Sequence, residues 1–429
     1  MILPEMLRAQ ERSASGDSMP PSWDVRFQQT VVIQGHPEFS ALYSGANSLQ
    51  TAAETKTSIT STLFFGVRLW SGSEVYINPE MSGGEGMSGA TGVAGFPNGE
   101  TFRIGNPKPT PFLARAYVAQ TFACGSVMQY LSPDVNQFGG SVPVERLTIV
   151  IGKFGLADFF DDNSYSHDPR TQFLNWALMN NGAWDYAADT RGYTWGLLSV
   201  YHAADWTVRG AGTLEPKYAN GLEMDTRVTK AFSLNVELER RYQWNKRDGT
   251  IRFLLFRNQA DMGNYDAAIG DTSVPKDIVL TRHVGRMKYG VGINVEQQIA
   301  DHAGLFGRLG WNDGINETWA YTEIDRTLSL GGELKGNSWN RQNDQLGAAL
   351  VLNALSQGHL RYLGDGGYGF LLGDGKLRYG PELVFETYYS ALLKPWMTLS
   401  VDYQFVTNPG YNRDRGPVHV FAARIHTEL

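Results

Sequence analysis

The stretch WDVRFQQTVVIQ at residues 23–34 decides the fold class, because apolar and polar side chains alternate along it. Val25 and Ile33 represent the mostly apolar odd positions, and Arg26 and Gln34 represent the polar positions between them. Successive side chains of a β-strand point to opposite faces of the sheet. The stretch is therefore predicted to be a strand with one apolar face and one face toward water.

The same alternation recurs along the chain and closes it, where Phe421 and Ile425 alternate with Arg424 and His426. Such strands, joined alternately by short turns and long loops, are typical of an all-β fold, the transmembrane antiparallel up-and-down β-barrel. We expect about sixteen strands, an even number within the range of bacterial barrels. Their expected spans are 23–34, 57–70, 73–80, 110–123, 143–153, 190–202, 204–214, 225–240, 249–258, 284–299, 302–311, 322–335, 343–354, 378–392, 396–407 and 418–429.

Two kinds of connection alternate between these strands. The tight links are Ser71-Gly72, His202-Ala203, Ala300-Asp301 and Lys394-Pro395. The long connections are 35–56, 81–109, 154–189, 259–283 and 355–377. Outer-membrane barrels sort their connections in this way, with short periplasmic turns and longer extracellular loops. Residues 124–142 break the sorting, because they are expected to form a periplasmic turn and yet are long.

Aromatic side chains gather near the proposed periplasmic end, where an aromatic girdle belongs. They are Trp23, Trp70, Tyr201, Trp206, Trp244 and Trp396. The alternative interpretation is that aromatic residues simply favour strands.

The composition is that of a folded protein without an obvious nucleic-acid partner. Hydrophobic residues make up 42% of the chain, charged residues 19%, and the formal net charge is -7. No apolar run approaches the roughly 20 residues of a membrane helix, so strands would have to span any bilayer. An acidic chain without a basic run argues against binding to nucleic acid. The single cysteine, Cys124, excludes an internal disulfide.

The pattern predicts one barrel domain at residues 23–429, preceded by a segment at 1–22 that is flexible or periplasmic. The first residues lack a charged region followed by an apolar core, so no signal peptide is expected in this sequence.

Several long and unusual segments follow one another along nearly the whole chain. They include HPEFSALYSGANSL at 36–49, VAGFPNGE at 93–100, DDNSYSHDPRTQFLNWALMNNGAWDYAAD at 161–189, NVEQQIADHAGLFGRLGWNDG at 294–314 and DYQFVTNPGYNRDRGPVHVFAARIH at 402–426. Together they resemble the carbohydrate-selective porin (OprB) family. The resemblance implies a barrel that admits sugars passively across the outer membrane of a Gram-negative bacterium. The final Leu429 departs from the aromatic residue that usually ends such barrels, which concerns assembly and not fold.

A sugar pore makes chemical demands that the sequence can be tested against. Sugars are neutral, rich in hydroxyl groups and have apolar faces, so a filter needs hydrogen-bonding groups, aromatic surfaces and balanced charges. The water-facing positions supply Arg26, Arg68, Glu74, Tyr76, Arg115, Tyr117, Arg146, Glu237, Glu239, Lys288, Glu296, Arg308, Asp325, Glu382 and Glu386. Polar side chains also brace the wall of any porin with ion pairs, and each of these residues has that alternative role.

Two long outer loops are expected to fold into the lumen and narrow it, because a barrel of this size otherwise leaves an open channel. The first, 81–109, is rich in glycine, and the second, 154–189, is rich in aromatic and charged residues. Within the second loop, residues 172–181 have helical spacing and are expected to form a short helix.

The candidate constriction residues come from the second loop and from the wall. The loop candidates are Arg170, Trp176, Trp184 and Asp185, and the wall candidates are Arg68, Glu74, Arg115, Arg146, Glu237 and Arg308. Indole faces can stack on sugar rings, and charged groups bond strongly to hydroxyls.

Catalytic and metal-binding motifs are weak. Residues 84–89 fit the pattern GxGxxG, but no helix is expected after them, so a nucleotide site is not supported. Asp158, Asp161, Asp162 and Asn163 offer oxygens to calcium without a recognised loop spacing. We therefore expect neither enzymatic activity nor a cofactor or metal.

The main hypothesis is a passive channel for small carbohydrates, with outer-membrane lipid around it. The alternatives are a barrel that exports polysaccharide or passes other small solutes, an outer-membrane hydrolase, and a soluble β-rich sugar-binding protein. The sequence leaves open whether the protein is a monomer or a trimer.

The alternation also predicts how single substitutions act. Val291 and Ile293 are placed on the apolar face, where arginine is expected to be costly, and Asn294 is placed on the water face, where arginine is expected to be mild.

Overall fold

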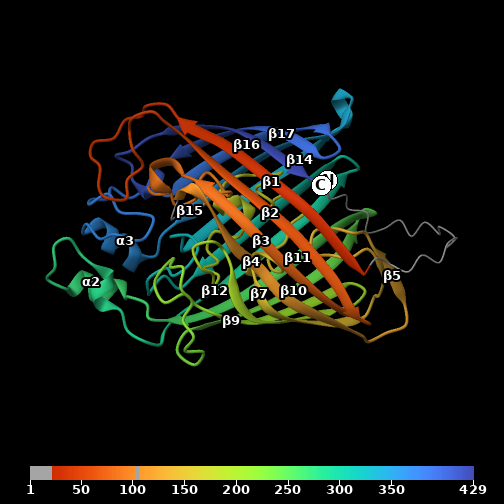
Figure 1. Ribbon diagram of the computed structural model, residues 1–429. Helices are drawn as coiled ribbons and strands as arrows, with labels where there is room; N and C mark the ends of the chain where they lie inside the picture. Colours follow the sequence, from red (N-terminus) through yellow and green to blue (C-terminus); the bar gives the residue numbers. More distant parts are fainter. Residues whose placement is uncertain (1–21, 102–105) are drawn as a thin grey trace.

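The computed structural model describes residues 22–101 and 106–429, and it confirms the expected barrel. Sixteen antiparallel strands close into a ring in which each strand pairs with its neighbours along the chain and the last pairs with the first (Figure 1). The expectation for the segment 1–22 falls almost wholly on residues 1–21, which lie outside the described residues.

The barrel strands have the following bounds. They are β1 (Trp23–His36), β2 (Glu54–Trp70), β3 (Ser73–Gly84), β4 (Asn106–Ala123), β7 (Arg146–Phe154), β8 (Thr194–His202), β9 (Trp206–Leu214), β10 (Phe232–Trp244), β11 (Arg247–Ala260), β12 (Arg286–Ala300), β13 (Ala303–Asn312), β14 (Arg326–Gly336), β15 (Arg341–Ala354), β16 (Glu382–Lys394), β17 (Met397–Thr407) and β18 (Val418–Glu428).

The remaining elements are short and lie in the connections. They are the hairpin strands β5 (Met128–Leu131) and β6 (Gly140–Pro143), the helices α1 (Trp176–Met179), α2 (Tyr265–Gly270) and α3 (Gln357–Gly364), and the 3-10 turns η1 (Met87–Gly89), η2 (Leu156–Asp158), η3 (Ile278–Thr281), η4 (Asn337–Trp339) and η5 (Pro409–Tyr411). In the described part of the chain no helix is both long and apolar enough to cross a membrane.

The alternation of side chains assigns the two faces of the wall as predicted. On β12, Ile293 is 36% exposed on the outer face, and Asn294 is 2% exposed on the inner face. The neighbours opposite Ile293 are Phe253 on β11 and Leu309 on β13, and both are exposed outward. The outer face is therefore a continuous apolar surface, as a barrel surrounded by hydrocarbon requires.

Short and long connections lie at opposite ends of the barrel, as expected. We call these ends the short-turn end and the long-loop end. The tight links lie at the short-turn end, and α2 and α3 lie at the opposite, long-loop end (Figure 1). The six aromatic residues expected in a girdle lie at strand ends on the short-turn side, and each is at least 41% exposed.

Some strand bounds differ from the expected ones because local contacts interrupt the pattern. The strand expected at 225–240 begins only at Phe232, because Arg227 turns back to bond Asp225 and Asp261. The following hairpin turns at Asn245 and Lys246, whose φ angles are 51° and 61°. Two adjacent residues with positive φ match the twist of a two-residue β-hairpin.

The long connection at 124–142 is explained by a small hairpin of its own. The two strands β5 and β6 pair with each other and lie beyond the short-turn end of the barrel (Figure 1). Between them, Phe138 is buried with its ring 5.9 Å from that of Tyr76, and the guanidinium of Arg68 lies 4.5 Å from the Phe138 ring. The hairpin therefore docks on the inner wall formed by β2 and β3.

Candidate functional site: the pore constriction

The loop between β7 and β8, residues 155–193, crosses the interior of the barrel and is named here the lumen loop. The backbone N–H of Asp161 donates to Glu237 on β10 at 2.7 Å. Farther along, the N–H groups of Leu174 and Asn175 donate to Glu386 on β16 at 2.5 and 3.0 Å. Since β16 lies across the ring from β7 and β8, the loop spans the lumen. The expected inward folding of a long loop is confirmed.

Buried carboxylates on the inner wall anchor two loops, the lumen loop and the glycine-rich loop between β3 and β4. Glu386 and Glu382 are fully buried, and Glu382 accepts from the N–H groups of Ala94 and Gly95 in the glycine-rich loop between β3 and β4. A buried carboxylate is costly unless hydrogen bonds satisfy it, and unpaired loop amides are costly in the same way. Each of these hydrogen bonds therefore satisfies a buried carboxylate and a buried backbone N–H together, and it holds a loop against the wall.

Replacing Glu386 by alanine should loosen the lumen loop. Two buried amides lose their acceptor, at a cost of about 1–3 kcal/mol for each unsatisfied group. We expect noisier open-channel current and faster proteolysis within residues 155–193. Asp344→Ala is the control, because Asp344 is also a buried wall carboxylate that accepts a backbone N–H, that of Leu392, but lies on β15 near the short-turn end. Equal current noise in the two variants would contradict the anchoring role.

The two tryptophans predicted for the constriction form the packed core of the lumen loop. The Trp176 ring stacks at 5.7 Å on Tyr321, and its Nε1 donates to the Asn98 backbone oxygen at 2.8 Å. Trp184 is only 1% exposed, and its Nε1 donates to Asn235 at 2.9 Å. The expectation that these indole faces stack on a sugar is corrected, because aromatic neighbours and wall groups already cover them.

Asp185 and Arg308 also hold the loop and do not face the passage. Asp185 is 2% exposed and accepts from the N–H groups of Trp319 and Ala320, both at 2.8 Å. Arg308 is 1% exposed and donates to the Leu178 backbone oxygen at 2.8 Å. Both were predicted as site residues, and the structure places them where they position the loop from behind.

The expected helix at 172–181 is shorter than predicted. Only Trp176–Met179 is helical, and it begins after Asn175, whose side chain caps the N–H of Ala177. Phe173 lies before the helix and packs against Tyr388 at 4.9 Å. The apolar spacing in this stretch thus reflects burial against the wall and not a longer helix.

The side of the lumen loop that remains partly exposed carries charges of both signs. Arg115 on β4 donates to Asp158 at 2.7 Å, and the Arg170 guanidinium lies 3.4 Å from Glu100. The side chains of Asp158 and Arg170 are 27% and 21% exposed. Two ion pairs therefore join the lumen loop to its surroundings, one to β4 and one to the glycine-rich loop between β3 and β4.

A phenol lies between these two ion pairs. The Tyr193 ring is 5.1 Å from the Arg115 guanidinium, and its hydroxyl donates to Glu80 on β3 at 3.3 Å. Burial and the Glu80 charge raise the pKa of Tyr193, while Arg115 and Arg170 oppose the shift. We name Glu80, Glu100, Arg115, Asp158, Arg170 and Tyr193 the constriction cluster.

The carboxylate and guanidinium of the loop part of this cluster stay charged at neutral pH. Burial alone would raise the pKa of Asp158, but the charge and hydrogen bond of Arg115 lower it overall. Burial alone would lower the pKa of Arg170, but Glu100 and Asp168 raise it. The lumen loop thus carries fixed charges of both signs.

A row of alternating positive and negative side chains lies on the inner face of β9–β12. Arg209 lies 2.9 Å from both Glu237 and Glu239, and Arg252 bonds Glu239 at 3.1 Å and Glu296 at 3.4 Å. These pairs belong to β9–β12 and brace the wall, as the alternative interpretation of the polar inner face foresaw.

Three predicted site residues lie away from the constriction. Arg68 and Glu74 are 3.4 Å apart at the short-turn end, and Arg68 also donates to the Gly139 backbone oxygen at 3.1 Å. Arg146 donates to the Pro143 backbone oxygen at 2.9 Å. Arg68 and Arg146 therefore contact the β5–β6 hairpin, and Glu74 pairs with Arg68, so the prediction that these three residues form the constriction is corrected.

Four members of the constriction cluster were missed as site residues: Glu80, Glu100, Asp158, which was weighed only as a calcium ligand, and Tyr193. Tyr193 directly precedes β8, so the alternation could not orient it, and Glu80 was placed at the end of an expected strand. Only the Tyr193–Glu80 bond identifies them.

The acidic group weighed as a calcium site is already paired within the protein. Arg115 bonds Asp158, Arg308 lies 3.0 Å from Asp161, and Asn163 bonds Asn294 at 2.7 Å. Among the described residues no group of His, Cys, Asp and Glu side chains is arranged to hold a metal ion. Residues 84–89 lead into the three-residue turn η1 and not into a helix.

Comparisons with known proteins agree with this architecture. The family model described as carbohydrate-selective porin, OprB family, matches residues 46–429. A high-pH structure of Pseudomonas putida OprB superposes with a TM-score of 0.73 at 15% identity, covering 95% of this chain and 94% of that one. The outer membrane channel DcaP of Acinetobacter baumannii has a TM-score of 0.50 at 9% identity, with 95% and 97% covered.

A curated relative is considerably longer than the part of it that this chain matches. Porin AaxA of Chlamydia abortus (strain DSM 27085 / S26/3) is 23% identical over 291 residues, which are 67% of this chain and 55% of that relative. The chain thus spans only about half of that relative, whereas the family model spans most of the chain. On the strength of that match and of the closed barrel, the protein belongs to the carbohydrate-selective porin (OprB) family.

Proposed function

We propose that the protein is a passive outer-membrane channel through which small neutral sugars diffuse, with the constriction cluster as its filter. The observation that carries the proposal is the lumen loop, which crosses the barrel and leaves paired charges and a phenol at the edge of the passage. Because the charges are paired, they attract neither cations nor anions strongly, while their hydrogen-bond donors and acceptors can bond to the hydroxyl groups of a sugar. In this proposal the short-turn end faces the periplasm and the long-loop end faces the exterior.

The roles of the predicted residues divide accordingly. Arg115 and Arg170 contact the passing sugar, and Trp176, Trp184, Asp185, Glu237 and Arg308 position the loop that presents them. Arg68, Glu74 and Arg146 act at the periplasmic mouth, where they hold the β5–β6 hairpin.

Liposome swelling with a series of neutral mono-, di- and trisaccharides tests the proposal. We expect rapid swelling with monosaccharides and slower swelling as the sugar grows, because the loop narrows the pore. The sugar should be recovered unchanged, and cleaved products would instead support a hydrolase. Rates that hardly fall with chain length would support polysaccharide export, and a lack of swelling with every sugar would overturn the proposal.

Alanine at Arg115 or Arg170 should shift ion selectivity. Removal of either guanidinium leaves Asp158 or Glu100 without its cation, so the pore becomes more selective for cations. The reversal potential in a KCl gradient measures the shift, and sugar swelling should change less. Arg361→Ala is the control, because Arg361 pairs with Asp266 on exposed helices. A reversal potential that stays at the control value would place both arginines outside the passage.

Glu237→Ala should also shift ion selectivity, but toward anions, because it removes a negative charge from the wall. The structure adds a second effect, because Glu237 also accepts from the Asp161 N–H in the lumen loop. We therefore expect this variant to show added current noise, like Glu386→Ala, together with its change in selectivity.

A further inference from the structure

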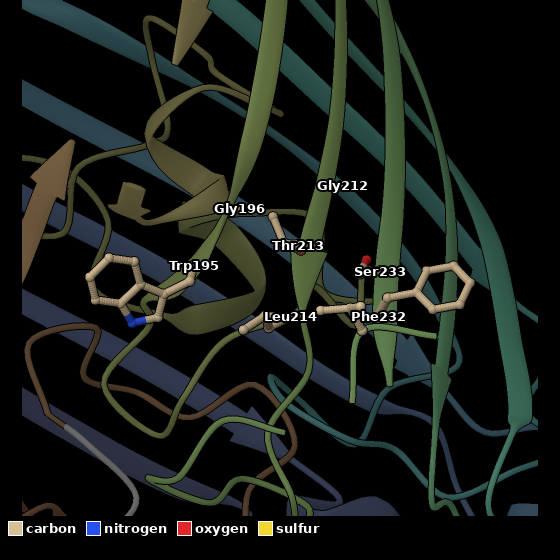
Figure 2. A pocket seen from close by; sticks show the side chains of 8 residues that line it. Trp195, Gly196, Gly212, Thr213, Leu214, Phe232 and Ser233 are labelled. Atoms are coloured by element: carbon tan, nitrogen blue, oxygen red, sulfur yellow. The ribbon is translucent and has the colours of Figure 1, made fainter. Parts of the chain in front are cut away.

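An apolar groove of about 440 Å³ lies on the outer surface of the barrel at the long-loop end. Figure 2 shows Trp195 on one side of it, Phe232 on the other and Leu214 between them. These residues belong to the start of β8, the start of β10 and the end of β9. The groove therefore lies at the rim where the apolar band of the wall meets the outer interface.

The hollow exists because a glycine stands where the neighbouring outward positions carry leucine. Gly212 pairs with Leu197 on β8 and with Leu234 on β10, which are 49% and 44% exposed. A Cβ built on Gly212 would meet nothing nearer than Leu234 Cδ2 at 3.7 Å. The space above this glycine is thus open to an apolar ligand.

A guanidinium borders the groove on the lipid-facing side. On β11 the outward positions run Ile251, Phe253 and Leu255, and Arg257 follows them toward the long-loop end. Its guanidinium lies 5.7 Å from the ring of Phe232, which lines the groove. Arg257 thus marks the upper edge of the apolar band, directly beside the groove.

Lys230 lies close to the same place. It precedes Phe232 by two residues and is exposed, and its backbone oxygen accepts from the Gln259 amide at 3.3 Å. Gln259 in turn follows Arg257 by two residues on the same face of β11. Arg257 therefore borders the apolar hollow, and the exposed Lys230 lies two residues before Phe232, which lines it.

Among the residues that the structure describes, neither of these cations has an acidic partner, whereas two other exposed arginines at this end do. Arg227 bonds Asp225 and Asp261, and Arg361 bonds Asp266. Arg257 contacts the neutral groups of Gln259 and Met287 and the ring of Phe232, and within residues 22–101 and 106–429 neither it nor Lys230 forms an ion pair. A cation at the edge of a hydrocarbon layer is costly unless an anion neutralises it.

We propose that this groove binds a phosphorylated, acylated glycolipid of the outer leaflet, with an acyl chain over Gly212 and a phosphate at Arg257 and Lys230. Guanidinium binds phosphate through paired, charge-assisted hydrogen bonds, and the hollow supplies the apolar contact. The proposal rests on the outer-membrane location in the proposed function and not on sugar transport.

Native mass spectrometry of the whole protein in detergent tests the site. The probes are bisphosphorylated lipid A, lipid A from which both phosphates have been removed, phosphatidylglycerol and phosphatidylcholine. Wild-type protein should retain bisphosphorylated lipid A most strongly. The double variant Arg257→Gln with Lys230→Gln should weaken that binding about tenfold or more, because bonds to charged groups contribute about 1.5–3 kcal/mol.

The groove itself has a matched pair of variants. Gly212→Leu fills the hollow and should weaken lipid A binding to a similar extent. Gly210→Leu lies two residues away on the same face of β9, where a Cβ meets nothing within 4 Å, and it should bind as the wild type does. Heat-modifiable migration on gels confirms that each variant has folded before binding is compared.

Several results would overturn the proposal. They are wild-type affinity in the double variant and in Gly212→Leu, equal binding of the dephosphorylated lipid, or equal binding of phosphatidylglycerol. Dissociation of an oligomer by Gly212→Leu with lipid binding unchanged would show that a second copy of the chain occupies the groove. Sugar swelling should be unaffected in all these variants, so failure of the lipid site and failure of the channel proposal are distinguishable.

Discussion

Deletion of residues 165–185 should raise single-channel conductance at least about twofold, because a barrel of this strand number is an open aqueous channel without an inward loop. The deletion removes Phe173, Trp176 and Trp184, which form the core of the lumen loop, and Arg170, which borders the passage. Block of the ion current by added sugar should disappear at the same time. Planar-bilayer recordings with and without sugar measure both effects.

The control is a deletion in a loop that does not enter the lumen. Residues 272–275 form an exposed segment between α2 and η3, in which Val274 is 93% exposed and the Ser273 N–H donates locally to Asp271 at 2.7 Å. Its removal should leave conductance and sugar block unchanged. If the 165–185 deletion also leaves both unchanged, the lumen loop does not narrow the pore, and the glycine-rich loop between β3 and β4 becomes the candidate.

Ile293→Arg should destabilise the barrel by about 2–4 kcal/mol, the cost of a guanidinium near the middle of the hydrocarbon layer. Ile293 faces outward between Phe253 and Leu309, so no polar group of the wall can accept the charge there. Urea unfolding of protein in lipid vesicles measures the loss. The substitution should leave sugar swelling of the folded protein unchanged.

Ile299→Arg is the matched control on the same strand and outer face. Ile299 is 43% exposed and lies one residue before the end of β12, where the cost of a charge falls to about 0–1 kcal/mol. Equal losses at positions 293 and 299 would show that depth in the membrane is not what decides the cost.

Asn294→Arg shows where reasoning from the alternation alone was incomplete. Asn294 does face inward, as predicted, but its amide donates to the backbone oxygen of Asp161 at 3.0 Å and to that of Asp162 at 3.0 Å. Arginine there would displace the lumen loop, so we now expect a severe effect where the sequence predicted a mild one. The prediction that Asn294 faces inward is confirmed, but the alternation did not predict that the lumen loop packs against it.

The strands and the facing of their side chains were determined by the sequence itself, because a period of two is a local property that needs no distant contact. The count of sixteen, the sorting of connections and the outward placement of Ile293 all follow from it. The predicted start of β10 was wrong, because Arg227 bonds Asp261, which directly follows β11, and the strand begins only at Phe232.

Only the tertiary structure decided which residues face the passage. The lumen loop has no period, and the positions of its side chains depend on partners far away in the chain, such as Glu386 for Leu174 and Asn235 for Trp184. Burial of an indole satisfies the hydrophobic effect as well as stacking on a sugar would, so composition alone cannot separate the two roles. Tyr193 became a filter candidate only when folding brought it to Arg115 and Glu80, because proximity across a barrel is set by closure and not by sequence.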